Sequence, residues 1–446
     1  MVLASTAAAT LVLALLSAGG GNASSGTAGR AGALSYLDDG VIKVGVDLNA
    51  GGAIAYLSLS PEGRNVIDAS SSGRLVQSSY YAGPRPFGKP EPPWQNMPWN
   101  PVAAGDRYGH GSRVLAQTND GRTIYTKSVP LQWALNDVPC ECTFESWISL
   151  DGRVVHVLSR LVNHRSDRRQ YPALPQELPA TYAVPSLSRL VTYSGSTPFS
   201  NGALTEIAHG CAPVGPFAAP EHWAALVNDR RWGLGIVNRA VWRMVGGVFC
   251  TAATPGSSPG SNSLETSYLA PTQHEILDYN IRYTYAYDLV LGSVRDIRAY
   301  ATAHGRASAP AYRFRHDRQH WWYRNARDSG WPIKGMLRVQ LGPHAQLVGP
   351  KQLWQASAVR SIYVRAAFRT RGTVAHLLWS IPNQAFSLTR RMAFSVVSDG
   401  RMRTYRVDLG GAKNYRGPVT GLGLEPPKTG LERRFVEIAC ISSTPC

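Results

Sequence analysis

Carboxyl and imidazole side chains are concentrated in residues 171–223. The acids there are Glu177, Glu206 and Glu221, and His209 follows Glu206 by three residues. Glycoside hydrolysis uses two carboxyl groups, one held protonated and one held charged. The stretch therefore supplies candidate catalytic residues for hydrolysis of a glycosidic bond.

The same stretch could also support elimination from a uronate sugar. That reaction needs a base and a group that neutralises the carboxylate, and Tyr182 or His209 with Arg189 would provide them. Prolines 175 and 179 flank Glu177 and would keep its backbone extended. The simpler alternative is an edge segment whose glutamate faces water.

A long segment without strand periodicity, Ser79–Gly111, carries the second group of candidates. Ordered loops of this length are usually functional. We expect aromatic rings to stack on sugar rings there, and polar side chains to reach the substrate. The rings are those of Tyr80, Tyr81, Trp94 and Trp99, and the polar group comprises Asp106, Tyr108 and His110. The alternative is a loop that folds back and buries its own tryptophans.

No cofactor or metal is expected. The sequence contains no P-loop, no GxSxG nucleophile elbow, no HExxH and no dinucleotide-binding fingerprint. His316, His320 and the aromatic run Trp321–Tyr323 could bind a metal or a sugar, but a packed hinge between domains is the simpler interpretation.

The elements that must position these residues are strands, because apolar residues recur with a period of two. Alternating runs occupy residues 40–47, 53–59, 143–150, 153–162, 279–291 and 361–368, and turn signals such as Asn119-Asp120-Gly121 and Asp151-Gly152 separate them. One helical pattern occurs, at Val294–His304. The fold class predicted is therefore all-β and antiparallel.

The chain length and the change in pattern near residue 305 predict two β-domains. Residues 34–305 are too many for a seven-stranded sandwich and fit a large β-supersandwich. Residues 306–335 would form a connector, and 336–446 a smaller β-sandwich or jelly roll. Residues 1–33 read as a signal peptide and flexible tail, since Val2–Ala18 is apolar and uncharged and small residues follow.

The excess of basic over acidic side chains lies almost entirely in the C-terminal third. The net charge is +17, and residues 301–446 hold 23 basic and 7 acidic side chains. Arginine makes up nearly all of the basic residues, which a high-GC genome would also produce. The functional alternative is a basic face for an anionic polysaccharide. No nucleic-acid-binding motif is present, so nucleic acid is not expected as a partner.

Six cysteines without zinc-site spacing predict disulfides in an oxidising compartment. We expect the pairs Cys440–Cys446 and Cys211–Cys250. With the apolar N-terminal segment, they indicate a secreted protein with no membrane association beyond that segment.

The segment Leu37–Leu57 (LDDGVIKVGVDLNAGGAIAYL) resembles the opening of galactose-mutarotase-like domains, with a strand, a Gly-Gly turn and a second strand. Val157–Ser166 and Trp223–Val237 are similar to later strands of that superfamily. The resemblance covers residues 34–305 and implies a carbohydrate-binding supersandwich. The C-terminal domain looks like a carbohydrate-binding module. No catalytic residue of the mutarotases is carried over to this chain.

These patterns predict a secreted protein that acts on a polysaccharide or oligosaccharide, possibly anionic, as a glycoside hydrolase or polysaccharide lyase. A non-catalytic glycan or cell-wall binder that uses the basic C-terminal domain is the alternative. A sugar mutarotase or epimerase is the third. The sequence leaves the oligomeric state open.

Overall fold

The computed structural model describes residues 34–69, 73–250, 265–305, 308–429 and 434–446. The described residues are almost entirely strands, and their only helix is α2 (Val294–His304). Every strand pairing between them is antiparallel. The predicted all-β fold class and the predicted helix are both confirmed. The predicted signal peptide and tail lie outside the described residues.

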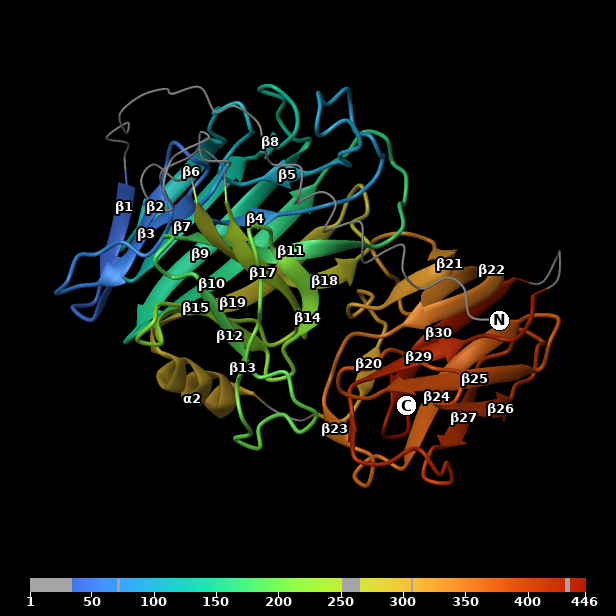
Figure 1. Cartoon of the computed structure of the whole chain (residues 1–446). Helices are drawn as coiled ribbons and strands as arrows, with labels where there is room; N and C mark the ends of the chain where they lie inside the picture. Colours follow the sequence, from blue (N-terminus) through green and yellow to red (C-terminus); the bar gives the residue numbers. More distant parts are fainter. Residues whose placement is uncertain (1–33, 70–72, 251–264, 306–307, 430–433) are drawn as a thin grey trace.

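Two large sheets form the N-terminal part of the molecule (Figure 1). The first sheet has the order β1 (Leu34–Asp38), β2 (Ile42–Asp47), β3 (Ala53–Leu59), β4 (Val76–Ser79), β11 (Leu174–Ala183), β18 (Thr266–Glu275), β17 (Arg243–Phe249) and β14 (Val214–Ala218), and β5 (Pro101–Val102) and β8 (Leu131–Gln132) extend it from β4. The second has the order β13 (Thr205–Glu206), β12 (Arg189–Thr192), β15 (Trp223–Val227), β16 (Trp232–Val237), β19 (Arg282–Ser293), β10 (Val154–Asn163), β9 (Cys142–Asp151), β7 (Thr123–Val129) and β6 (Arg113–Asn119).

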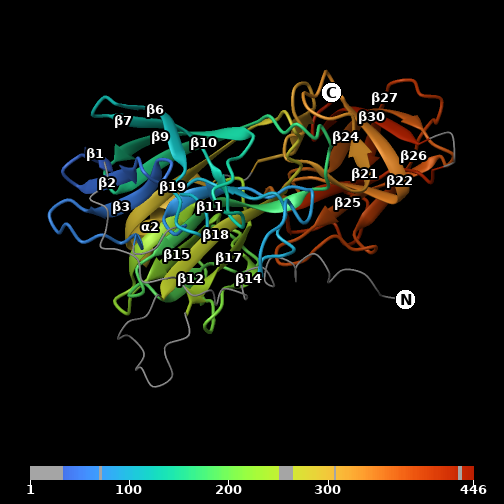
Figure 2. The same ribbon diagram turned by 90° about the horizontal axis from the view of Figure 1, so that it is seen from above.

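The first and second sheets pack face to face around one continuous core (Figure 2). Along β10, Val155, Val157 and Leu161 point inward, and the side chains that alternate with the inward positions point outward. This period of two is the geometric reason why alternating sequence predicted strands here. Both hairpin signals lie where they were predicted, at the β6–β7 and β9–β10 turns.

Helix α2 covers one half of the outer side of the second sheet. Its apolar face, Val294, Ile297 and Ala301, packs on side chains from β15 and β16. Ser293 caps the first turn, and Asp296 completes a capping box with it. The other half of that outer side, over β10 and β9, carries exposed and half-buried side chains.

The third sheet has a separate core that contains Trp321, Phe368 and Trp379. Its order is β26 (Arg391–Ser395), β25 (Val374–Ser380), β29 (Gly421–Glu425), β22 (Leu337–Val348), β30 (Phe435–Ser442), β24 (Ser361–Arg369) and β27 (Arg403–Asp408). β20 (Ala311–Arg313) and β21 (Trp322–Asp328) pair with β30 and β22, and β23 (Trp354–Gln355) pairs with β28 (Pro418–Val419). The predicted connector 306–335 thus contributes strands to this sheet, and the exact domain boundaries stay a prediction.

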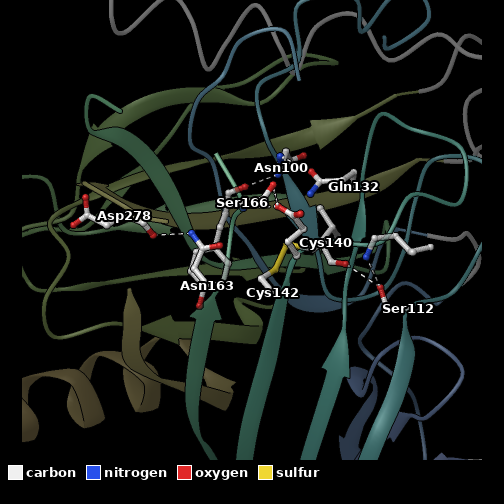
Figure 3. Close-up of a disulfide and its surroundings, with 12 residues drawn as sticks. Asn100, Ser112, Gln132, Cys140, Cys142, Asn163, Ser166 and Asp278 are labelled. Carbon is white, nitrogen blue, oxygen red and sulfur yellow. Dashed lines mark hydrogen bonds between the residues drawn. A yellow bond between two sulfur atoms is a disulfide. The ribbon is translucent and has the colours of Figure 1, made fainter. Parts of the chain in front are cut away.

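All six cysteines form disulfides, and the predicted pairs Cys211–Cys250 and Cys440–Cys446 are confirmed. Cys140 and Cys142 form the third, at the start of β9 (Figure 3). Nearby, Asn163 at the end of β10 donates to the carbonyl of Asp278. Disulfides persist in oxidising compartments, so the three bonds indicate such an environment for this chain.

Candidate functional site

The three glutamates predicted as catalytic do not share a cleft. Glu206 lies on the edge strand β13 and forms a two-pronged ion pair with Arg189, at 2.6 and 2.9 Å. Glu221 is buried and accepts from the guanidinium of Arg298 on α2 at 2.8 and 3.0 Å. Glu206 is exposed and Glu221 is buried, and each is held by its own arginine, which corrects the expectation that residues 171–223 supply one site.

Local geometry explains the positions of the neighbouring candidates. The Arg189 guanidinium holds the pKa of Glu206 below its usual value, so Arg189 is engaged and Glu206 is kept charged. His209 is half-buried, and its Nε2 lies 2.8 Å from the carbonyl of Ser188. These contacts stabilise the surface between β12 and β13, and Arg189, Glu206 and His209 do not line either of the two hollows described below.

Glu177 is in a different environment, on the central strand β11 of the first sheet. Its carboxylate accepts from the hydroxyls of Tyr81, at 3.0 Å, and Tyr268, at 2.5 Å. Tyr182 packs on Tyr268, with ring centroids 5.1 Å apart. Burial raises the pKa of Glu177. The structure therefore brings together Glu177, Tyr81 and Tyr182 of the predicted set, and the alternative of an edge glutamate facing water is wrong.

The loop of residues 79–111 is largely packed on the body of the protein. Tyr80 and Trp99 are fully buried, so neither ring can stack on a sugar. The predicted ligand-binding role of these two residues is therefore wrong, and both belong to the hydrophobic core. Trp94 is half-buried and meets Trp133 edge-on. The alternative that the loop buries its own tryptophans is confirmed for Trp99 and not for Trp94.

Asp106 stabilises the turn at the end of this loop through hydrogen bonds. Its fully buried carboxylate accepts from the backbone of Tyr108, His110 and Asp137, and it lies 2.9 Å from the His110 ring. The exposed Tyr108 hydroxyl donates to Glu91 at 3.1 Å. Asp106 is therefore a turn-forming residue, and this corrects its predicted role in reaching a substrate.

A hollow of about 650 Å³ lies where β19 extends past the end of β16. We call it the trough. Exposed Thr284 and Ala286 of β19 lie at its base, Trp147 and Leu158 line it on β9 and β10, and the turn of residues 238–241 lines it opposite. Its volume is within the range of ligand sites. Short side chains on β19 beside the larger ones on β9 and β10 create the hollow.

A histidine–aspartate pair lines one end of the trough. Antiparallel register places His156 of β10 directly opposite Asp288 of β19. The Nδ1 atom of His156 lies 2.7 Å from Asp288 Oδ1, while Arg239 and the Tyr300 hydroxyl donate to Oδ2 at 3.1 and 2.9 Å. Nε2 of His156 has no partner among the described residues. The imidazole is thus oriented by the Asp288 carboxylate, and its second nitrogen faces no partner among the described residues.

Aromatic and basic side chains continue this face of the sheet beyond the trough. Trp147 packs on Tyr125, with ring centroids 5.1 Å apart, and the guanidinium of Arg160 lies 4.9 Å from the centre of the Trp147 ring. All three are half-buried or exposed. Such rings offer apolar faces for stacking on a sugar.

A second histidine–carboxylate pair lines the other end. The Nδ1 atom of His320 lies 2.6 Å from Glu275, which also accepts from Gln273 at 2.6 Å and from the Tyr283 hydroxyl at 3.2 Å. Burial opposes protonation of His320, but Glu275 outweighs it and raises the pKa of His320. His320 was identified in the sequence but interpreted as part of a hinge.

His156, Asp288, Arg239 and Trp147 were missed by the sequence reasoning. The available signal was that the alternating runs 153–162 and 279–291 each place a titratable residue on their outward face. A sequence does not state the register between two strands 132 residues apart, so the pair could not be recognised from it.

Within the described part of the chain, no group of three or more His, Cys, Asp or Glu side chains is arranged to hold a metal ion. Over the same residues, no helix has the length and apolar character that crossing a bilayer requires.

Neither a protein-family model nor a curated protein sequence matches the chain. Solved structures do match. A galactose mutarotase-like protein from Lactobacillus casei ATCC 334 is 8% identical, with a TM-score of 0.38, over 58% of this chain and 100% of that one. A galactose mutarotase related enzyme from Lactobacillus acidophilus is 10% identical, with a TM-score of 0.38, over 58% and 98%. A GH36 alpha-galactosidase from Geobacillus stearothermophilus is 10% identical, with a TM-score of 0.35, over 58% and 41%.

The first two bear the name of the family that the Leu37–Leu57 motifs resemble. Similarities of this size carry no argument about activity.

Proposed function

We propose that this protein is a secreted, carbohydrate-active enzyme that cleaves a uronate-containing polysaccharide by elimination, with the trough as its active site. The observation that carries the proposal is the His156–Asp288 pair, which leaves Nε2 of His156 without a partner among the described residues, in a ligand-sized hollow beside the half-buried Trp147. The disulfides and the apolar N-terminal sequence support export.

Elimination fits the trough better than hydrolysis because of how its carboxylate is engaged. Asp288 accepts from Arg239 and Tyr300 and lies against His156, and Glu275, beside the trough, is paired with His320. A hydrolase needs two carboxyl groups that face the scissile bond, and both of these are already occupied by neighbouring side chains. An imidazole oriented by a carboxylate, with its second nitrogen available, is instead suited to remove a proton.

The reaction balances without a further reactant. Nε2 of His156 takes the proton from C5 of the uronate, and the C5–H electrons form the C4=C5 double bond. The C4–O bond to the leaving sugar then breaks, and the leaving oxygen takes the proton from Nε2 of His156, which returns the imidazole to its starting form. Arg239 lines the trough and would neutralise charge that develops on the uronate carboxylate.

The test is incubation of the purified protein with polyuronates, sulfated glycosaminoglycans and neutral glycans, followed by ultraviolet absorbance of the unsaturated product. We expect product from a uronate polymer, and a loss of about 10²–10⁴-fold in rate for His156→Gln. His164→Gln, at an exposed histidine without a side-chain partner among the described residues, should keep full activity.

Two results would contradict the enzyme proposal. If His156→Gln formed the unsaturated product as fast as the native protein, His156 would not be the base. Retention on a glycan without any product would favour the alternative, a non-catalytic binder. That alternative predicts that removing residues 336–446, where the basic excess lies, abolishes retention and that salt weakens it.

A further inference from the structure

A second hollow, of about 550 Å³, lies between the first two sheets and the third. We call it the interdomain cavity. Glu275, Arg282 and Tyr283 line it from β18 and β19, and Arg318, His320 and Lys351 line it from the C-terminal part of the chain. It shares Ala240, Tyr283, Thr284 and His320 with the trough, so the two hollows adjoin each other. A chain-like ligand in the trough could extend into it.

Two cations of the interdomain cavity have no carboxylate partner among the described residues. Lys351 donates to the Ser380 hydroxyl at 2.8 Å, and its ammonium lies 5.7 Å from the centre of the Phe386 ring. Arg282 is exposed at the start of β19 and forms no ion pair within the described residues. Free positive charge therefore borders this hollow from both sides.

Further cations lie around Lys351. Burial, together with the positive charges of Arg243 and Arg390, lowers the pKa of the Lys351 ammonium to about 8. Nε of Arg390 is buried without a hydrogen bond, and its other nitrogens donate to Gln384 and the carbonyl of Ala385. Neither arginine forms an ion pair within the described part of the chain. Like charges gathered in this way oppose folding unless an anion offsets them.

The acids of the interdomain cavity are already engaged. Glu275 is paired with His320, and the Asp317 carboxylate accepts from the backbone of Gln319 at 2.9 Å. Arg318 is neutralised by Asp278 at 2.6 Å and by Asp328. Asp317 has no cationic partner among the described residues, but Lys351 and Arg282 outnumber it, so the excess charge in the cavity is positive.

We propose that the interdomain cavity binds an anionic substituent of a saccharide, a carboxylate or a sulfate, through Lys351 and Arg282. The inference rests on the proposed glycan trough and deepens it, because it names the charged part of the substrate and where that part binds. A carboxylate and a sulfate present the same acceptor chemistry to an ammonium and a guanidinium.

Calorimetric titration at low salt tests the proposal with three tetrasaccharides: an oligogalacturonate, a sulfated oligogalactan and a neutral oligogalactan. We expect one or both anionic tetrasaccharides to bind, and the neutral one to bind at least about tenfold more weakly. The two anionic arms show which of the two substituents is recognised. Higher salt should weaken the anionic complex.

Lys351→Met and Arg282→Gln should each lower the affinity for the anionic tetrasaccharide at least about tenfold and leave the affinity for the neutral one unchanged. Lys413→Met, at an exposed lysine in the third-sheet part of the chain, is the matched control and should bind as the native protein does. Arg282 is exposed, so its variant tests the idea even if the Lys351 variant folds poorly. Thermal unfolding of each variant checks the fold.

Unchanged anionic affinity in both variants, or equal affinity for neutral and anionic tetrasaccharides, would overturn the inference. Its outcome is separate from that of the elimination proposal. His156→Gln should still bind the anionic tetrasaccharide more tightly than the neutral one, whether or not the native protein cleaves it. A missing product with intact, charge-dependent binding would therefore overturn only the reaction.

Discussion

The buried glutamates Glu221 and Glu177 differ in the groups that donate hydrogen bonds to them. Glu221 is paired with Arg298 and also accepts from the Trp223 indole at 3.1 Å, so its charge is fully compensated. Glu177 accepts from the hydroxyls of Tyr81, Tyr268 and Ser79 and has no cationic partner among the described residues. The first is a stabilising ion pair, and the second is a carboxyl group that favours its protonated form.

A substitution at Glu177 should reveal its raised pKa in the pH dependence of the unfolding free energy. A raised folded-state pKa gives stability that is fully present below the unfolded pKa and is lost as pH rises through the folded pKa. Relative to Glu177→Gln, the native protein should therefore lose unfolding free energy between about pH 4 and about pH 7.5. Chemical denaturation at both pH values measures the difference.

Glu177→Ala provides the comparison, because it leaves the hydroxyls of Tyr81 and Tyr268 without their acceptor. It should destabilise the protein by on the order of 3 kcal/mol at either pH. Parallel stability profiles for the native protein and Glu177→Gln would show that the carboxyl group ionises as easily in the folded state as in the unfolded one.

At the scale of elements, strand β19 decides where the trough lies. Its inward side chains are the tyrosines 283, 285 and 287, which are buried in the core, whereas its outward side chains Thr284 and Ala286 are short and exposed. Helix α2 covers the other end of the same sheet face through Val294 and Ile297. The hollow is therefore the part of the second sheet that neither the helix nor large side chains fill.

Filling the trough from its base should block ligands without disturbing the core. Ala286→Trp places a large ring on the outward face of β19, so we expect glycan binding and turnover to fall at least tenfold, to about a tenth or less of native values. The melting temperature should stay close to that of the native protein. Thr404→Trp, at an exposed position of β27, is the control, and equal loss in both variants would contradict the assignment of the trough.

At the scale of the whole molecule, a buried ionic network joins the two parts. Arg318 forms ion pairs with Asp278, from the β18–β19 connection, and with Asp328 on β21. Gln170 donates to both carboxylates, at 2.9 and 2.6 Å. The interdomain cavity lies beside this network, so its shape depends on the two parts staying in register.

Arg318→Met should uncouple the two parts. It leaves two buried carboxylates without their cation, which costs about 3–5 kcal/mol, and calorimetry should show a lower or divided unfolding transition. The control is Arg338→Met, which breaks a largely exposed pair with Glu437 and should change stability by less than about 1 kcal/mol. A single transition unchanged by Arg318→Met would show that apolar contacts alone hold the parts together.

The sequence by itself determined the elements, because strand alternation, the Ser293–Asp296 capping box and turn residues act over a few neighbours along the chain. It also indicated Glu177 and Tyr182 as catalytic candidates and Tyr81 as a stacking ring, but not that the three lie together.

Only the tertiary structure decided which titratable groups meet. Glu206 and Glu221 are neighbours in sequence but are held by different partners, Arg189 and Arg298. His156 and Asp288 lie 132 residues apart and are paired by the register of β10 with β19. Such pairing depends on long-range packing of the sheets, and local sequence patterns do not encode it.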